Sequence, residues 1–278
     1  MRLGFLLAIL FLVLAQFQAM AAERRVLTLA YDVNESWPWH LGTYTVPDAM
    51  PGLSLEYISE AARRLDVDVR FIRAPFRRAL AMLKGGEVDG VFEASFRPER
   101  QEYGVYPLTA QGEPDASRSM FVQSYVFYVR RGERRFGWNG DKIDGLDGMV
   151  GVLRNTSVAD DLTDRGYPVF EVGDNLRAME MTAASRLDAV LLLDRIGKAV
   201  FHRHPELADA LQTLDLPWER KPYYLMLSHA LAAQEPAFAA RLWVELARVA
   251  HSPFAEERLA AYEKALMASG RGESAANR

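Results

Sequence analysis

The sequence predicts an α/β protein of two lobes, in which each lobe is a mostly parallel sheet flanked by helices and two hinge strands join the lobes. Three observations lead to this fold class. Short apolar runs alternate with segments of helical periodicity, which is typical of parallel sheets. This alternating series begins twice along the chain. The 278 residues are also too many for one compact core and suit two domains of ordinary size.

The first lobe is predicted from residues 22–120, with a return of the chain over residues 228–268. Its strands are expected at 26–31, 67–72 and 88–92, and its helices at 53–65 and 76–83. In the first helix Leu55, Ile58, Ala62 and Leu65 recur at helical spacing. This β-α-β-α-β order predicts right-handed crossovers.

The second lobe is predicted within residues 121–227, together with the hinge strands. Its strands are expected at 149–153, 169–172 and 189–193, and its helices at 157–165, 175–184 and 195–202. The β-rich stretches 120–130 and 223–227 are expected to lead out of the first lobe and back. Helices at 236–250 and 254–267 should then pack on the first lobe, and the small, polar residues 269–278 should form a disordered tail. Two sheet edges that face each other across a hinge predict a ligand cleft.

Residues 1–21 are interpreted as an export signal peptide. Arg2 supplies the positive start, and an apolar run of twelve residues follows it over 3–14. Ala19 and Ala21 form an A-x-A cleavage site before Ala22. The apolar run is shorter than the roughly twenty residues that span a bilayer, which argues against the alternative of an uncleaved anchor. With no cysteine to carry a lipid, we expect a free periplasmic protein.

Composition excludes several function classes. A net charge of −4 gives no basic footprint for nucleic acid. The absence of cysteine and the presence of only five histidines argue against a metal site, and no cofactor motif is present. His202 and His204 are close in sequence, but this spacing before Pro205 is more typical of solvated side chains. No G-x-S-x-G, P-loop or H-E-x-x-H motif indicates an enzyme.

Five segments resemble those of the family 3 extracellular solute-binding proteins, the amino-acid-binding components of ABC importers. They are Trp37-Pro38-Trp39, the Pro51-Gly52-Leu53 turn, Leu83 to Gly90 (similar to L-x-x-G-x-x-D), Arg97-Pro98-Glu99-Arg100 (similar to T-P-E-R) and Val150 to Ser157 (similar to V-G-V-x-x-G-T). The resemblance covers roughly residues 26–262. It implies a periplasmic-binding-protein fold that captures a small polar solute, such as an amino acid, without catalysis.

The resemblance also implies binding residues. Arg100 matches the family arginine that grips a ligand carboxylate, a task that suits a guanidinium. The alternative is a surface arginine paired with Glu99 or Glu102. Asn155, Thr156 and Ser157 lie between a strand and a helix, where they could seat an anion or simply cap the helix.

Five further side chains complete the predicted ligand site. Trp37 and Trp39 are expected either as flat pocket walls or as lobe packing. Glu93, followed by Ser95, and Asp194 come at the ends of buried strands, one in each lobe, where they could hold a positive group. The interval from Asp188 to Asp194 is one residue longer than in the family, which leaves two alternatives for the position of the family acid, Asp194 and Leu193. The interval from Asp89 to Arg100 is one residue shorter than in the family.

Three functions remain open at this level. The leading prediction is solute capture by a monomer for a membrane ABC permease. The second is the ligand-binding subunit of a sensor receptor. The third is a dehydratase-like enzyme on the same scaffold, with Glu93 as general acid or base.

Overall fold

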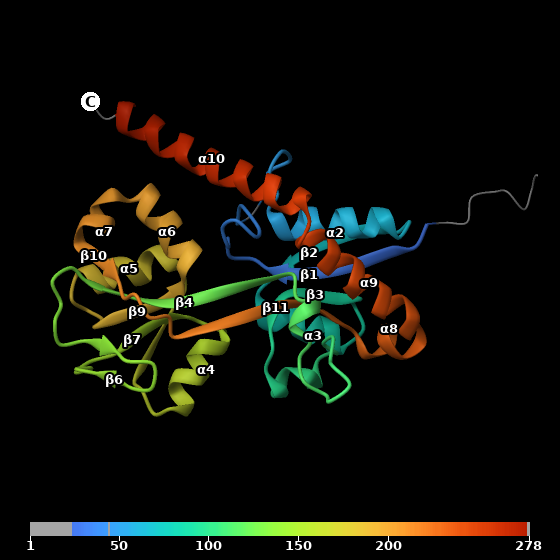
Figure 1. Ribbon diagram of the computed structural model, residues 1–278, viewed down its shortest axis with the longest axis horizontal. Coiled ribbons are helices and arrows are strands. Elements are labelled where there is room, and N and C mark those ends of the chain that lie inside the picture. The colour runs from blue at the N-terminus through green and yellow to red at the C-terminus, as the bar shows by residue number, and fades with distance from the viewer. Residues whose placement is uncertain (1–23, 44, 277–278) are drawn as a thin grey trace, which may run out of the picture.

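The protein consists of two α/β lobes joined by two long strands, as Figure 1 shows. This computed structural model describes residues 24–43 and 45–276, with side chains up to residue 268. The predicted signal peptide lies outside these residues. The two lobes share one continuous nine-stranded sheet, in the order β2-β1-β3-β11-β4-β9-β7-β8, with β10 beside β4. The predicted fold class is confirmed.

Lobe 1 contains the first β-α-β-α-β series. Its elements are β1 (Val26–Asp32), α2 (Leu53–Arg64), β2 (Asp68–Ala74), α3 (Phe76–Lys84) and β3 (Gly90–Ser95). The strand β1 lies in the middle and pairs in parallel with β2 and β3. It is apolar along most of its length because helices cover both faces of the sheet. Two short 3-10 helices follow, η1 (Pro98–Glu102) and η2 (Ala116–Arg118).

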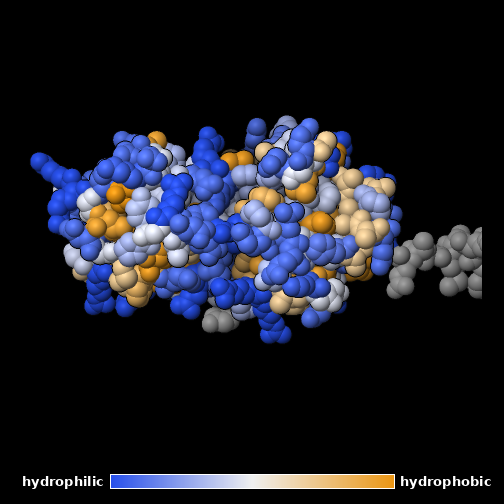
Figure 2. Space-filling model, turned by 90° about the horizontal axis from the view of Figure 1, so that it is seen from below, coloured by the Kyte–Doolittle hydropathy of each residue, from blue (hydrophilic) through white to orange (hydrophobic). Residues whose placement is uncertain are grey.

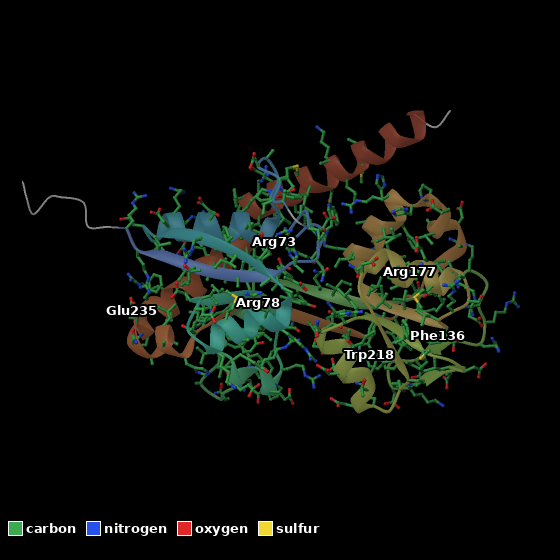
Figure 3. All side chains as sticks on the ribbon, turned by 180° about the vertical axis from the view of Figure 1, so that it is seen from behind. Arg73, Arg78, Phe136, Arg177, Trp218 and Glu235 are labelled. Atoms are coloured by element: carbon green, nitrogen blue, oxygen red, sulfur yellow. The ribbon has the colours of Figure 1, made fainter. Side chains whose placement is uncertain are left out.

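Lobe 2 repeats this design with two added helices. Its main elements are β7 (Val150–Leu153), α4 (Ser157–Asp164), β8 (Val169–Val172), α5 (Asn175–Ala183), β9 (Ala189–Leu193), α6 (Asp194–Arg203), α7 (Pro205–Ala210) and β10 (Leu211–Thr213). A hairpin of β5 (Gly137–Trp138) and β6 (Ile143–Asp144) precedes them. Phe136 and Trp218, labelled in Figure 3, belong to the aromatic cluster that anchors this hairpin, in which Trp138 and Trp218 have ring centroids 4.4 Å apart.

Each hinge strand belongs to both lobes. The strand β4 (Phe121–Arg130) pairs with β11 over its first half and with β9 over its second. The strand β11 (Glu219–Leu227) pairs first with β4 and then with β3. It begins at Glu219, four residues before the predicted strand. The prediction missed this start because three consecutive charged residues followed by a proline do not resemble a buried strand. The sheet therefore continues through the hinge.

The C-terminal helices depart from the sequence prediction in several respects. They are α8 (His229–Gln234), α9 (Pro236–Ala250) and α10 (Pro253–Ala276). Helix α9 packs on α2 as expected, but α10 contacts α2 and α9 of lobe 1 and α6 of lobe 2. Figure 1 shows α10 (red) running from lobe 1 across to lobe 2. It also continues past residue 267 into the predicted tail, since no proline follows Pro253 to stop it.

The surface and the core fit a protein that folds in water. Figure 2 shows mainly hydrophilic residues where the two lobes meet, with apolar residues scattered elsewhere. The largest group of buried apolar side chains runs from lobe 1 through the hinge strands into lobe 2. No helix within residues 24–276 has the length and apolar character needed to cross a membrane.

Candidate functional site

A cleft of about 100 Å³ lies between the lobes. Six of the nine predicted ligand-binding residues line it: Glu93, Ser95, Arg100, Asn155, Thr156 and Ser157. They come from the carboxyl ends of β3 and β7 and from the turns that follow, because parallel strands direct their ends to the same edge of a sheet. The cleft therefore stands where the two α/β series predict it.

Tyr125 and Tyr223 of the two hinge strands also line the cleft. Their hydroxyl groups are 2.8 Å apart. Burial raises the pKa of Tyr125 to about 12 and that of Tyr223 well above its ordinary value. Both phenols are therefore neutral at physiological pH and offer hydrogen bonds rather than charge.

Arg100 is held in the cleft without an acidic partner. Its Nη1 donates to the carbonyl oxygen of Ser95 at 3.0 Å and to Ser95 Oγ at 3.1 Å, and its Nη2 reaches the carbonyl oxygen of Asn155 in lobe 2 at 3.5 Å. The guanidinium lies 5.1 Å from the ring centroid of Phe76. In the described part of the chain no carboxylate forms an ion pair with it. This arrangement fixes a positive charge and leaves it uncompensated.

Neither of the two acids named as surface partners pairs with Arg100. Glu99 pairs with Arg97, with nitrogen and oxygen 3.2 Å apart, and Glu102 pairs with Lys84 at the same distance. Arg100 is instead half-buried, and lies at the cleft.

The turn before α4 presents backbone and hydroxyl groups to the same cleft. Asn155 has a φ of 63°, a left-handed conformation that turns the chain sharply from β7 into the helix. Thr156 occupies the N-cap position, but its hydroxyl donates to the carbonyl oxygen of Leu153 at 2.6 Å, and no side chain caps the helix. The first N–H groups of α4 are thus available to an anion.

Ser157 connects the lobes rather than capping the helix. Its Oγ lies 3.0 Å from Ser95 Oγ of lobe 1 and accepts a hydrogen bond of 3.0 Å from the buried Lys221 Nζ of β11. Ser157 was predicted either to seat an anion or to cap the helix. Its hydroxyl group instead contacts Ser95 and Lys221, and the sequence indicated neither contact.

Glu93 has a partner that the sequence analysis missed. Both carboxylate oxygens lie 3.0 Å from Nδ1 of His40, and Nε2 of this histidine is hydrogen-bonded to the carbonyl oxygen of Asn34. Because both ring nitrogens face acceptors, the geometry favours the doubly protonated, positive imidazolium. Burial alone would lower the pKa of His40, but the charge and hydrogen bonds of Glu93 outweigh it and raise the pKa.

A bulge in β3 directs Glu93 towards His40. Glu93 has a φ of 59°, and the register of β3 against β11 shifts between Val91 and Ala94. Two residues on β3 oppose one on β11 there, which re-aims the side chain. Periodicity alone could not indicate His40 as the partner of Glu93, because His40 lies in a loop 53 residues away.

Three predicted residues do not line the cleft. Trp37 and Trp39 are buried in the core, where Trp39 stacks on Phe121 with ring centroids 3.6 Å apart, so the packing alternative holds for them. Asp194 is the first residue of α6, a position where an acid is favourable to the helix dipole, and it pairs with Lys198 at 2.7 Å. Leu193 lines the cleft in its place.

Ion pairs join the lobes on the cleft rim. Arg97 of lobe 1 contacts Asp161 at 2.6 Å and Asp164 at 3.2 Å, both on α4. Glu35 of lobe 1 pairs with Arg203 of α6 at 2.8 Å. These contacts hold the lobes together and describe a closed arrangement. Among the residues that the structure describes, no group of His, Asp or Glu could hold a metal ion.

Solved structures share this architecture. The ligand-binding core of GluR0 in complex with L-glutamate has a TM-score of 0.67 and 17% identity, over 87% of this chain and 99% of that chain. The fold is that of the periplasmic binding proteins. An amino-acid ABC transporter substrate-binding protein from Streptococcus pneumoniae, bound to L-arginine, has a TM-score of 0.62 and 15% identity, over 88% and 95% of the two chains.

A sensor domain has the same fold. A histidine kinase sensor domain with similarity to periplasmic binding proteins has a TM-score of 0.63 and 17% identity, over 90% of this chain and 97% of that chain. No protein-family model matches the sequence, and no curated protein matches it either. The solved structures therefore show the fold of this chain. The roles of the residues that line the cleft are inferred from its geometry.

Proposed function

We propose that this chain is an exported binding protein whose lobes close over a small carboxylate-bearing solute for delivery to an ABC importer. The observation that carries this proposal is the uncompensated guanidinium of Arg100 between the lobes, bonded to both of them. A carboxylate is a suitable partner because it can accept two parallel hydrogen bonds from such a group. The N–H groups at the start of α4 would add to the same anion seat.

Closure provides the affinity in this proposal. A solute held between Arg100 and α4 touches both lobes, so its binding favours the arrangement in which the lobes meet. Charged hydrogen bonds are stronger once water is excluded, which suits the capture of a very soluble molecule.

A thermal-shift screen of the purified protein against amino acids, polyamines and small organic acids tests this function. A true ligand at a hundredfold excess over its dissociation constant stabilises the native state by about 2.7 kcal/mol. Arg100→Ala should abolish the shift that a carboxylate ligand gives. Arg78→Ala, on α3 of lobe 1 (Figure 3), removes an exposed arginine outside the cleft and should keep it. A carboxylate ligand that binds equally well to the Arg100 variant would contradict the proposal.

A sensing role is the second candidate, favoured by the likeness of 90% of this chain to a sensor domain. The two roles are separated by deleting the gene and measuring uptake of the identified ligand. Lost uptake supports transport. Intact uptake with an altered transcriptional response to the ligand supports sensing.

A further inference from the structure

Lobe 2 extends the cleft into a smaller cavity of about 30 Å³, here called the aliphatic pocket. Five of the eight residues that line it are aliphatic: Leu153, Leu191, Leu192, Leu193 and Ile196. They come from the ends of β7 and β9, which pair in parallel, and from the first turn of α6. Tyr125 of the hinge strand β4 pairs with Leu193 and contributes to the lining. Lobe 2 and a hinge strand therefore build the aliphatic pocket together.

The polar side chains of the aliphatic pocket offer a water molecule few partners. The Thr156 hydroxyl donates to the carbonyl oxygen of Leu153, and the Tyr125 hydroxyl lies 2.8 Å from that of Tyr223. Asn175, at the start of α5, is the third polar residue of the lining. A buried water makes about two to four hydrogen bonds, and cavities that lack such partners stay dry. A hydrocarbon group is therefore the favourable occupant of this pocket.

The aliphatic pocket adjoins the carboxylate site proposed above. Six residues line both the pocket and the larger cleft: Tyr125, Leu153, Thr156, Asn175, Leu193 and Ile196. Arg100 reaches the carbonyl oxygen of Asn155, which lies in the turn between Leu153 and Thr156. A solute whose carboxylate is held by Arg100 and this turn therefore has the aliphatic pocket next to it.

Resting on the function proposed above, we propose that the solute is a carboxylic acid with a compact aliphatic group, such as isopropyl, which occupies the aliphatic pocket. The small volume of the pocket restricts this group to a few carbon atoms. A polar group of the same shape would lose its water there without adequate hydrogen-bond partners, which is costly. Acids with and without an amino group both fit this description.

Pairs of solutes that share a shape but differ in polarity test this inference. We would measure dissociation constants by calorimetry for leucine against asparagine, valine against threonine, and 4-methylpentanoate against succinamate. In each pair the first member has methyl groups where the second has an amide or a hydroxyl group. The tightest-binding solute should be an aliphatic member, and it should exceed its polar partner at least about tenfold. A polar member that binds most tightly, a smaller preference, or no binding by any aliphatic member overturns the inference.

The outcomes also separate this inference from the function on which it rests. A polar member that binds most tightly, and whose binding Arg100→Ala abolishes, overturns the aliphatic group but leaves the capture of a carboxylate solute intact. If no solute in these pairs or in the wider thermal-shift screen binds, both the aliphatic group and the proposed function fail.

A matched pair of leucine variants tests where the aliphatic group lies. Leu193→Asn keeps the size of the side chain and gives the aliphatic pocket an amide group, so the preference for the aliphatic member should fall about tenfold. Leu216→Asn makes the same exchange at a leucine of lobe 2 that is 44% exposed and does not line the cleft, and it should leave the preference unchanged. Leu153→Thr, with the same expected loss, serves if the Leu193 variant does not fold. An unchanged preference in a folded pocket variant overturns the assignment of the aliphatic pocket.

Discussion

The ion pairs of Arg97 with Asp161 and Asp164, here called the Arg97 latch, give a direct way to weaken lobe closure. Arg97 is in lobe 1 and both acids are on α4 of lobe 2. Arg97 does not line the cleft itself, but its Nη1 also donates to the carbonyl oxygen of Ser157 at 3.3 Å, so Arg97→Ala removes this bond together with the ion pairs. If the latch favours the closed form, this variant should open the protein and weaken ligand binding.

The structure sets the size of the effect. Asp164 is 69% exposed, so its pair with Arg97 contributes little. The bond to Asp161 is stronger, since the two side chains are 16% and 26% exposed. Asp161 keeps Lys221 as a partner after the substitution, and the acids that lose their partner, Glu99 and Asp164 among them, are exposed, so no buried charge is left unpaired. The expected loss is therefore at the low end for a charged hydrogen bond, about 1.5 kcal/mol.

This loss lowers the ratio of closed to open protein about tenfold. When the closed form becomes a minority, the apparent dissociation constant rises by up to the same factor. Calorimetry would measure the dissociation constant, and small-angle X-ray scattering of the ligand-free protein would report opening as a larger radius of gyration. Arg177→Ala is the control, because Arg177 (Figure 3) pairs with Glu180 inside lobe 2. An Arg97→Ala protein with unchanged affinity and unchanged scattering would refute the latch.

Two further predictions concern stability. The folded-state pKa of His40 is raised, so the stability that its charge contributes is complete below its ordinary value of 6.5 and is lost as pH rises through the folded pKa. In urea unfolding, the stability advantage of the wild type over His40→Gln should shrink over this window, and a pH-independent difference would contradict the charged pair. Gly197→Ala would place a Cβ 2.1 Å from the Tyr128 hydroxyl and should cost about 1–3 kcal/mol, whereas Gly137→Ala has open space; equal melting temperatures would argue against this packing.

The general position of the site was predictable because it depends on local patterns. The buried strand that carries Glu93 and the strand-to-helix turn at Asn155 both follow from hydrophobic periodicity and from the residues that close each segment, although β3 continues past its predicted end to Ser95. Parallel strands then bring these ends to one edge. The shared lining of the cleft by Arg100, Ser95 and the α4 turn follows from this arrangement.

The errors concern side-chain direction. Trp37 and Trp39 lie between Ser36 and His40, which line the cleft, yet both tryptophans are buried in the core. Burying large aromatic surfaces is favourable, and Phe121 provides a stacking partner for Trp39. The sequence could not decide whether Leu193 or Asp194 faces the cleft. Neighbouring residues at the end of a strand face opposite ways, so a shift of one residue exchanges them.

The sequence by itself determined the two α/β series, the hinge strands and the strand ends from which the cleft is built, because each is specified by periodicity within a short segment. Only the tertiary structure decided the charge of the cleft. The pairing of Glu93 with His40 and the Arg97 latch join residues 53 to 67 positions apart. Local pattern carries no information about such partners, since they meet only when the sheet and the hinge are assembled.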